Sequence, residues 1–506
     1  MIASPLPRAI PATETALGGD RRPDLLFVNP PSPDGDTWIR CQHRAGQRAP
    51  DGMVWPQTAL AQLAALFPDR EVAILDAGAR RASWQQFSME LESRPPRWYI
   101  THLAGPTLSG DLLGVALAKQ AGAITVAFGP AASPAARELL QQCPALDYVV
   151  CGEPELTLQE LVDTVDRCES APVSPGTGAE ESPSRCSAPP LARIRGLAWR
   201  SGGEPKVNAP RPLIPSLDDL PLPRHDLLPL AAYRGPSIQA PAAMVVTGRG
   251  CPGRCSFCLK HVTYGFSVRL RSPEHILGEL ILLKRLGVRH VYMQADLFTV
   301  SREQVAELCR LMLAEGLRIS WSCSSRTDTV DLELLQLMGR TGCRRITWAI
   351  ESASEVVLWR NGKGTRAEET ERAITWARAA GIESWGSFLI GLPGETDETV
   401  QQTITLAKRL SLERAIFELA VPRLGTPLWT QAAESGWLRQ GAHWADADAS
   451  GPAILDYPWL RATRLEQWLE RAYREWALRP GSLWSQLQHL TPARAPVSLD
   501  VSLYQT

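Results

Sequence analysis

The chain has 506 residues, of which 44% are hydrophobic, and its 53 Lys and Arg nearly balance its 54 Asp and Glu. This predicts a globular protein of two to four domains, without the basic field that attracts nucleic acid or an anionic membrane surface. No run of about 18 apolar residues predicts a membrane span, and the first residues do not form a signal peptide, so we expect a cytoplasmic protein.

Residues 1–22 are rich in Pro, Ala and Arg and predict a disordered leader. Over residues 23–166, short apolar runs alternate with amphipathic segments, which predicts a doubly wound parallel sheet of the Rossmann-like α/β type. The ligands of such a sheet bind beyond the carboxyl ends of its strands. The predicted strands are residues 24–28, 71–75, 99–101, 124–128 and 148–151, and the predicted helices are 57–67, 112–121 and 156–165.

The ends of these strands resemble those of the cobalamin (B12)-binding Rossmann domain. That family usually carries D-x-H-x-x-G after the first strand, S-x-L after the third and G-G after the fourth. Here Thr101-His102-Leu103 matches S-x-L, and Gly129 keeps one glycine of the pair. The resemblance implies cobalamin contacts at Pro30, Thr101, His102, Leu103, Gly129, Gly152 and Glu153.

The sequence departs from that family because no His follows the first strand before His43, so D-x-H-x-x-G is absent. We therefore expect that any bound cobalamin lacks this axial ligand. His102 is an alternative ligand, although a lone His at a strand end is more often a hydrogen-bonded structural residue. A second alternative is a domain that has lost cobalamin and serves as a substrate or docking module.

Residues 167–240 are expected to form a flexible insertion and linker. The segment 167–192 is rich in Ser, Pro, Gly, Ala and Glu and has no periodicity. Residues 217–223 are punctuated by prolines, as in a connection between domains.

Three cysteines follow within eight residues, Cys251, Cys255 and Cys258, in a loop with Pro and Gly. Thiolates at this spacing can face one object, which suits an iron–sulfur cluster. The alternatives are a zinc site completed by a remote His or Cys, or cysteines that are merely structural. Because the next cysteine is Cys309, one corner of a cluster would stay open. The scattered positions of the others among the 11 cysteines favour reduced thiols.

The C-x-x-x-C-x-x-C pattern, with Phe257 before its last cysteine, resembles the signature of the radical S-adenosylmethionine (radical SAM) superfamily. The resemblance implies a [4Fe–4S] cluster on the three cysteines and SAM on the open iron. It further implies a 5′-deoxyadenosyl radical and an external electron donor of the flavodoxin or ferredoxin type.

Strands and helices alternate again over residues 241–435, which predicts the partial (β/α)6 barrel of a radical SAM core. Active-site residues of a barrel lie at the carboxyl ends of its strands. The predicted strands are residues 243–247, 290–293, 318–322, 345–350, 383–390 and 415–420, and the predicted helices are 273–286, 302–315, 331–340, 368–380 and 398–410.

Several of these strand ends match SAM-binding positions of the superfamily. Asp296 would face the SAM ammonium, with a helix cap or surface residue as the alternative. The run Gly391–Thr396 resembles the loop beside the SAM adenine, and 422–428 resembles the loop that ends the core. The resemblance implies SAM contacts at Phe257, Gln294, Asp296, Ser324, Arg326, Glu351, Gly391 and Leu392.

Residues 436–506 are rich in Trp and predict a C-terminal helical cap. Its tryptophans are expected to pack in a core, or alternatively to form an aromatic wall for a flat substrate such as a tetrapyrrole.

These patterns together predict a cobalamin-dependent radical SAM enzyme that methylates an unactivated carbon of a small-molecule substrate. The first alternative is oxidative ring formation on a tetrapyrrole, as in the anaerobic magnesium-protoporphyrin ester cyclase group. The second is a non-catalytic cofactor-binding or sensor protein. A methylthiotransferase fits less well, because the sequence has no second N-terminal cysteine triad.

Overall fold

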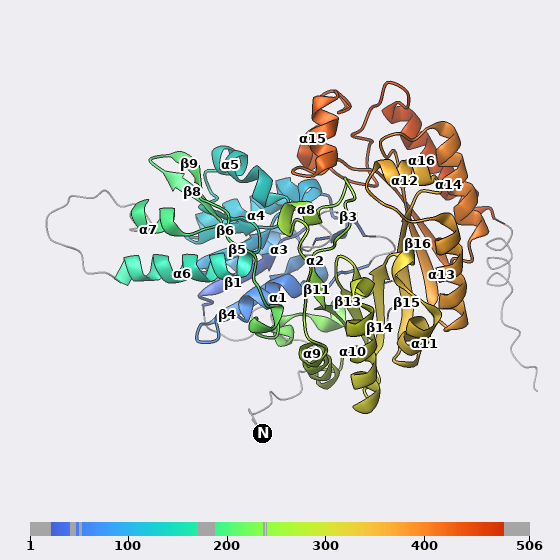
Figure 1. The fold of residues 1–506 in the computed structure, drawn as a ribbon. Helices are drawn as coiled ribbons and strands as arrows, with labels where there is room; N and C mark the ends of the chain where they lie inside the picture. The colour runs from blue at the N-terminus through green and yellow to red at the C-terminus, as the bar shows by residue number, and fades with distance from the viewer. Residues whose placement is uncertain are drawn as a thin grey trace, which may run out of the picture.

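The computed structural model describes residues 22–40, 47–49, 53–170, 188–235, 238 and 240–479. They form two sheets that lie side by side, with helices around each (Figure 1). The predicted disordered leader falls outside the described residues, except for Arg22, and so does Trp484. None of the helices in the described part of the chain combines the length and apolar character needed to cross a membrane.

The first sheet has seven strands in the order β4-β1-β5-β6-β7-β8-β9, and its first five strands are parallel. Every residue of β1 is buried, as expected for a strand covered by helices on both faces. The strand order reverses between β1 and β5, where ligands of such sheets bind. The strands are β1 (Leu25–Asn29), β4 (Val72–Asp76), β5 (Trp98–His102), β6 (Ile124–Phe128), β7 (Tyr148–Val150), β8 (Leu197–Ser201) and β9 (Glu204–Val207).

This domain extends beyond its predicted end near residue 166. Strands β8 and β9 lie inside the range predicted as insertion and linker. They continue the sheet because β8 pairs antiparallel with β7, and β9 pairs antiparallel with β8. Gly202 and Gly203, both with positive φ, supply the two-residue turn between them. Leu197, Ala198 and Trp199 are buried, so this segment is part of the core.

Seven helices accompany this sheet. The small ribbon of β2 (Trp38–Ile39) and β3 (Gln47–Arg48) lies between β1 and α1 in the chain. The helices are α1 (Thr58–Ala64), α2 (Ala77–Arg80), α3 (Trp84–Ser93), α4 (Leu108–Gln120), α5 (Ala132–Gln142), α6 (Pro154–Ser170) and α7 (Ala188–Arg193).

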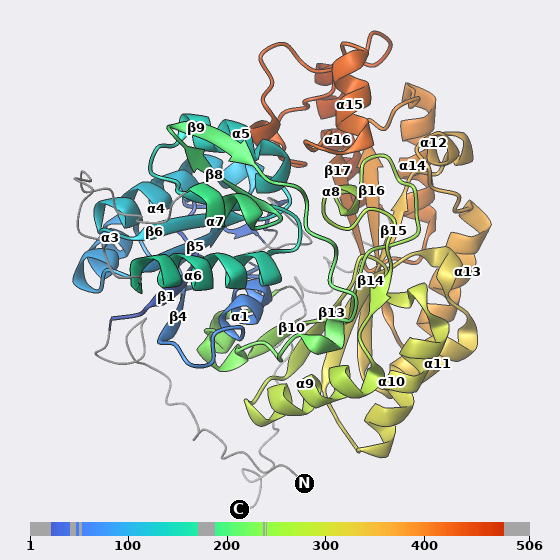
Figure 2. The same cartoon turned by 60° about the vertical axis from the view of Figure 1, so that its left-hand side comes forward.

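The second sheet has six parallel strands in chain order, β10-β13-β14-β15-β16-β17, which is the predicted open barrel (Figure 2). Its helices begin at side-chain caps such as Ser272, Ser301 and Asp331. The strands are β10 (Ala242–Val246), β13 (His290–Gln294), β14 (Ser320–Ser325), β15 (Cys343–Glu351), β16 (Glu383–Ile390) and β17 (Arg414–Leu419). The helices are α9 (Pro273–Arg285), α10 (Arg302–Ala314), α11 (Leu332–Arg340), α12 (Glu355–Arg360), α13 (Ala367–Ala379) and α14 (Asp397–Arg409).

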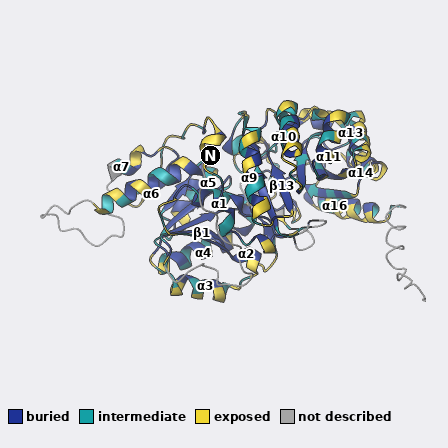
Figure 3. Cartoon of the chain, turned by 90° about the horizontal axis from the view of Figure 1, so that it is seen from below, coloured by how far each residue is buried: buried dark blue, intermediate teal, exposed yellow. Residues whose placement is uncertain are grey.

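The two sheets share one hydrophobic core. Buried residues from β1 and α1 belong to the same cluster as residues of all six barrel strands. Thr58 Oγ1 in α1 donates a hydrogen bond to Met244 O in β10 at 2.9 Å. Viewed from below, buried positions continue from one sheet to the other (Figure 3).

The C-terminal region packs against both domains. Helix α15 (Pro427–Glu434) and the single turn η8 (Trp444–Asp446) precede α16 (Ala462–Ala477), which lies on β17 and α14. Trp444 is buried and its indole donates a hydrogen bond to Glu138 of α5, while Trp468 and Trp476 are buried in the main core. These three tryptophans therefore serve in packing.

Candidate functional site

The cysteine loop lies between the ribbon strand β11 (Gly248–Arg249) and the short helix α8 (Lys260–Thr263). Gly250 has φ +85°, and a Cβ there would lie 1.8 Å from Ser267 O, so only glycine fits. The Gly250 amide donates a hydrogen bond to Asp296 Oδ2 at 2.7 Å. This bond holds the start of the cysteine loop beside the segment that follows β13.

Two of the three thiols approach the same glycine of the loop. A Cβ placed on Gly253 would lie 3.3 Å from Cys251 Sγ and 3.9 Å from Cys255 Sγ, and the Gly253 amide donates to Cys251 Sγ at 3.4 Å. Burial, together with the charges of Asp296, Cys255 and Cys251, raises the pKa of the Cys258 thiol to about 12. The neutral form of this thiol is therefore favoured until a metal supplies positive charge.

Within the described residues, no three His, Cys, Asp or Glu side chains are arranged to hold one metal ion. A structural zinc site brings four ligands to a single ion, whereas the thiolates of an iron–sulfur cluster bind separate irons.

Two cations adjoin Cys255. Burial raises the pKa of its thiol, and the positive charges of Lys363 and Arg326 act in the opposite direction. Arg326 forms an ion pair with Asp328 at 2.6 Å, and Lys363 pairs with Glu351 at 3.0 Å while donating to Ala349 O. A site lined in this way can stabilise several thiolates together.

Glu351 occupies a strained position at the carboxyl end of β15. Its φ of +68° is rare for a residue with a side chain, and the register of β15 on β16 shifts just before it. The structure thus brings three of the predicted SAM residues, Asp296, Arg326 and Glu351, beside the cysteine loop. Their binding of SAM stays a prediction.

Gln294 and Ser324 line a cavity of about 60 Å³ inside the barrel. The Gln294 amide donates to Ala295 O at 3.1 Å. The wall facing these strands comes from the first domain, where the Trp55 ring lies 4.4 Å from that of Tyr292. The cavity is lined by Ile39, Met53, Trp55, Tyr292, Met293, Gln294, Ser322, Cys323, Ser324, Arg345, Thr347, Trp385 and Ile416.

The loop after β16 is held mainly by protein contacts. The amides of Gly391 and Leu392 donate to Glu395 Oε2 at 2.6 and 3.2 Å, and Tyr457 Oη donates to Gly391 O at 2.8 Å. Leu392 is fully buried, and the partly buried Phe257 packs against the same core.

Asn361 joins this loop to the cysteine loop. Its side-chain amide donates to Pro393 O at 3.0 Å, and its backbone carbonyl accepts from the Ser256 amide at 3.0 Å.

The predicted cobalamin residues lie mostly within the protein interior. Thr101 Oγ1 donates to Val28 O, Leu103 is fully buried, and the Gly152 amide donates to Ser133 Oγ. His102 is 5% exposed and packs edge-on against Phe128. A Cβ on Gly129, which has φ +123°, would lie 2.8 Å from His102 Nε2, so the imidazole lies against that backbone. This packing favours the structural role of His102.

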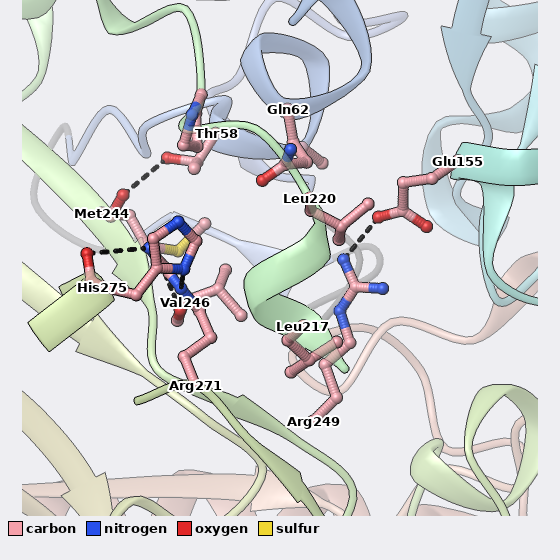
Figure 4. A pocket seen from close by; sticks show the side chains of 12 residues that line it. Thr58, Gln62, Glu155, Leu217, Leu220, Met244, Val246, Arg249, Arg271 and His275 are labelled. Carbon is pink, nitrogen blue, oxygen red and sulfur yellow. Dashed lines mark hydrogen bonds and ion pairs between the residues drawn. The ribbon is translucent and has the colours of Figure 1, made fainter. Parts of the chain in front are cut away.

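Glu153 joins the two domains. It forms ion pairs with Arg249 and Arg269, both at 2.8 Å, and accepts from the Ile214 amide. Arg249 also pairs with Glu155, and Figure 4 shows this contact at the edge of a cavity of about 30 Å³. Burial alone would raise the pKa of Glu153, but the two arginines hold it below its ordinary value.

A larger cavity, of about 670 Å³, opens beside the carboxyl ends of β1 and β4. Asn29 and Pro31, on either side of Pro30, form part of its lining, together with Trp38, Trp84 and the buried Arg40. Arg40 pairs with Asp111 at 2.5 Å. The sequence predicts Asn29-Pro30-Pro31 at the end of the first strand and Trp55-Pro56-Gln57 at the border of a cavity between the domains, and residues of both segments line this cavity. The Trp and Arg residues within 38–84 are the sequence feature that could have indicated the remaining lining of this cavity.

Residues 245–407 match the family model described as the radical SAM superfamily. An uncharacterized methyltransferase of Pyrococcus horikoshii is 33% identical over 67% of this chain and 69% of its own length. The anaerobic magnesium-protoporphyrin IX monomethyl ester cyclase of Cereibacter sphaeroides is 26% identical over 71% of this chain, which spans 56% of that enzyme.

Two solved structures share the fold. The radical SAM methyltransferase TsrM of Kitasatospora setae, with cobalamin and a [4Fe–4S] cluster bound, has a TM-score of 0.61 and 19% identity over 92% of this chain and 91% of its own. The cobalamin-dependent radical enzyme OxsB, with aqua-cobalamin and SAM bound, has a TM-score of 0.60 and 17% identity over 90% of this chain and 61% of its own.

Proposed function

This chain belongs to the radical SAM superfamily, and on that premise we propose that it is a cobalamin-dependent methyltransferase acting on a small molecule. The observation that carries the proposal is the cysteine loop, in which Cys251 and Cys255 both approach Gly253 and Cys258 lies within reach of their charges, with a carboxylate and two cations nearby. The methyltransferase relative and the shared two-domain fold support the reaction class.

The cysteine loop is built for a [4Fe–4S] cluster, which supplies the electron that cleaves bound SAM to methionine and a 5′-deoxyadenosyl radical. The Gly253 amide, aimed at Cys251 Sγ, stabilises negative charge on that sulfur. Lys363 and Arg326 do the same electrostatically for Cys255. The chain thus tunes the site through hydrogen bonds and charge.

The side chains around the loop are suited to the polar groups of SAM. Asp296 contacts Gly250 through Oδ2, so Oδ1 can accept from the ammonium group. Glu351 and Arg326 add one acceptor and one donor at neighbouring strand ends. Gln294 and Ser324 line the barrel cavity, where we place the substrate carbon that loses a hydrogen atom.

The first domain would hold cobalamin over the carboxyl ends of its strands, where the group would supply a methyl to the substrate. The cavity beside Asn29 and Pro31 supports this location. We assign His102 to packing against Gly129 and not to cobalt. His102→Ala should therefore retain the absorption spectrum of cobalamin-loaded wild-type protein, whereas a spectral change of the cobalt centre would restore His102 as a ligand.

The decisive experiment uses anaerobically reconstituted protein, dithionite and SAM with a labelled methyl group. We expect 5′-deoxyadenosine and cobalamin-dependent transfer of the label. Cys255→Ala should lose cluster iron and 5′-deoxyadenosine formation, while Cys143→Ala, which alters a buried cysteine of the first domain, should keep both. Absence of 5′-deoxyadenosine from the wild-type protein would refute the proposal.

Ring formation is the second candidate, because the cyclase relative matches 71% of this chain. A cyclase would form 5′-deoxyadenosine without transferring the labelled methyl group to product.

A further inference from the structure

Helix α12 presents the two most exposed large apolar side chains in the described part of the chain. Trp359 is 80% exposed and Val356 is 76% exposed. They are three residues apart and share one face of the helix, while Val357 and Leu358 are buried on the other. Isolated apolar residues are common on surfaces, but Trp and Arg are the residue types enriched at the centres of protein interfaces.

This helix ends directly beside the cysteine loop. Ser256 donates through its amide to Asn361 O at 3.0 Å and through its hydroxyl to Asn361 Oδ1 at 3.2 Å. Cys255 Sγ lies 3.9 Å from Gly362 O, and the Gly362 amide donates to Trp359 O at 3.0 Å. A short, bonded segment therefore connects the exposed indole to one of the cluster cysteines.

The surface around Trp359 is basic. Arg360 and Arg254 are both exposed, and Arg254 lies beside Gly362 at the end of this segment. The Arg254 guanidinium lies over the Phe266 ring at 5.5 Å, and Phe266 is itself 58% exposed. Glu355 is the only acidic residue of α12. Such a surface attracts an acidic partner and accelerates its association at low salt.

We propose that Val356, Trp359, Arg360 and Arg254, here called the donor face, bind a small acidic one-electron carrier of the flavodoxin type. This inference rests on the proposed function, which requires an electron at the cysteine loop. The carrier loses one electron, and that electron breaks one S–C bond of SAM to give methionine and a 5′-deoxyadenosyl radical. The apolar edge of a flavin suits Trp359, and the arginines suit the acidic surface around it. Small contact areas are usual for such transient redox encounters.

The test combines a binding measurement with two sources of electrons. Full-length wild-type protein, Val356→Ala/Trp359→Ala and Arg360→Glu are titrated with flavodoxin, and SAM cleavage is driven either by reduced flavodoxin or by dithionite. Leu313→Ala is the matched control, because Leu313 is 45% exposed on α10. We expect the donor-face variants to bind flavodoxin about tenfold more weakly than wild type. At limiting concentrations of reduced flavodoxin, their rate of SAM cleavage should fall by a similar factor. Dithionite-driven cleavage should stay unchanged, and Leu313→Ala should resemble wild type.

Rising salt should weaken wild-type binding more than that of Arg360→Glu. Equal flavodoxin affinity and equal flavodoxin-driven rates in wild-type and Val356→Ala/Trp359→Ala protein would overturn the proposal. Reduced ferredoxin serves as a third electron source, and a loss confined to ferredoxin-driven cleavage would overturn the choice of partner. If the wild-type protein fails to cleave SAM even with dithionite, the proposed function fails, and the flavodoxin titration still decides whether the donor face binds this carrier.

Discussion

Glu395 is a fully buried carboxyl group that holds the loop after β16. Burial raises its pKa from 4.5 to about 7, although the Gly391 and Leu392 amides partly oppose this. The native state then binds a proton that the unfolded state releases, so stability is highest below pH 4.5 and falls as pH rises toward 7. We expect a loss of about 3 kcal/mol over this range from this residue. Glu395→Gln keeps an oxygen acceptor, so it should flatten this part of the pH profile of chemical unfolding.

The control for this prediction is Glu434→Gln, at an exposed position of α15. It should leave the pH profile unchanged. An unaltered profile in Glu395→Gln would mean that the carboxyl group is already ionised in the folded protein.

Lys363 and Glu351 form a buried ion pair whose loss should be costly. Replacing Lys363 by Met leaves the Glu351 carboxylate buried without its partner, for which we expect a decrease of about 3–5 kcal/mol in the free energy of unfolding. Arg310→Met breaks an exposed pair with Glu307 and should change it by less than about 1 kcal/mol. Urea unfolding of both variants measures the difference, and equal small effects would contradict it.

A cluster site at the cysteine loop could be proposed from the sequence because its three cysteines lie within eight residues. His102 and Glu153 could not be assigned in the same way, since their surroundings come from distant segments. His102 packs against Gly129, one strand away, and Glu153 meets Arg249 and Arg269 across the domain boundary. The end of a predicted strand identifies an edge of the sheet. It does not identify which residues of another domain contact that edge.

Among the elements, the ribbon of β11 and β12 (Arg269–Leu270) is joined to helix α6 by buried charges. Arg249 in β11 precedes the cysteine loop by two residues, and it pairs with Glu153 and Glu155. We expect Arg249→Gln to destabilise the protein by about 3–5 kcal/mol and to release cluster iron faster, because the loop loses its anchor to the first domain.

Arg211→Gln is the matched control for this anchor, since Arg211 pairs with the partly exposed Glu160 within the first domain. It should leave iron retention unchanged. Iron loss measured after a chelator challenge separates the two variants, and equal retention would show that the loop does not depend on the ribbon.

The sequence pattern identified the eleven parallel strands of the two large sheets, because buried apolar runs between amphipathic helices are distinctive. It missed the helices α2, α3, α5, α7, α8, α12 and α15, and the ribbons that pair only two residues on each strand. The pair β8 and β9 was missed because the Ser- and Pro-rich segment before it resembles a linker.

The whole molecule has a continuous core, which predicts cooperative unfolding. Helix α1 packs on β1, β4 and β10, and both domains contribute to one hydrophobic cluster. We expect one dominant calorimetric transition for the full chain. A fragment of residues 241–479 should expose the surface that α1 covers and aggregate. Two well-separated transitions, with a stable fragment, would contradict this prediction.

Part of the lining of the barrel cavity comes from residues outside the barrel. Ile39, Met53 and Trp55 come from the first domain, yet they lie against Tyr292 and its neighbours. Substrate preference can therefore diverge through a short stretch that lies far from the three cysteines of the loop in the sequence. A chimera that exchanges this stretch between two homologues should carry the preference of its donor, while the radical-generating machinery remains that of the recipient.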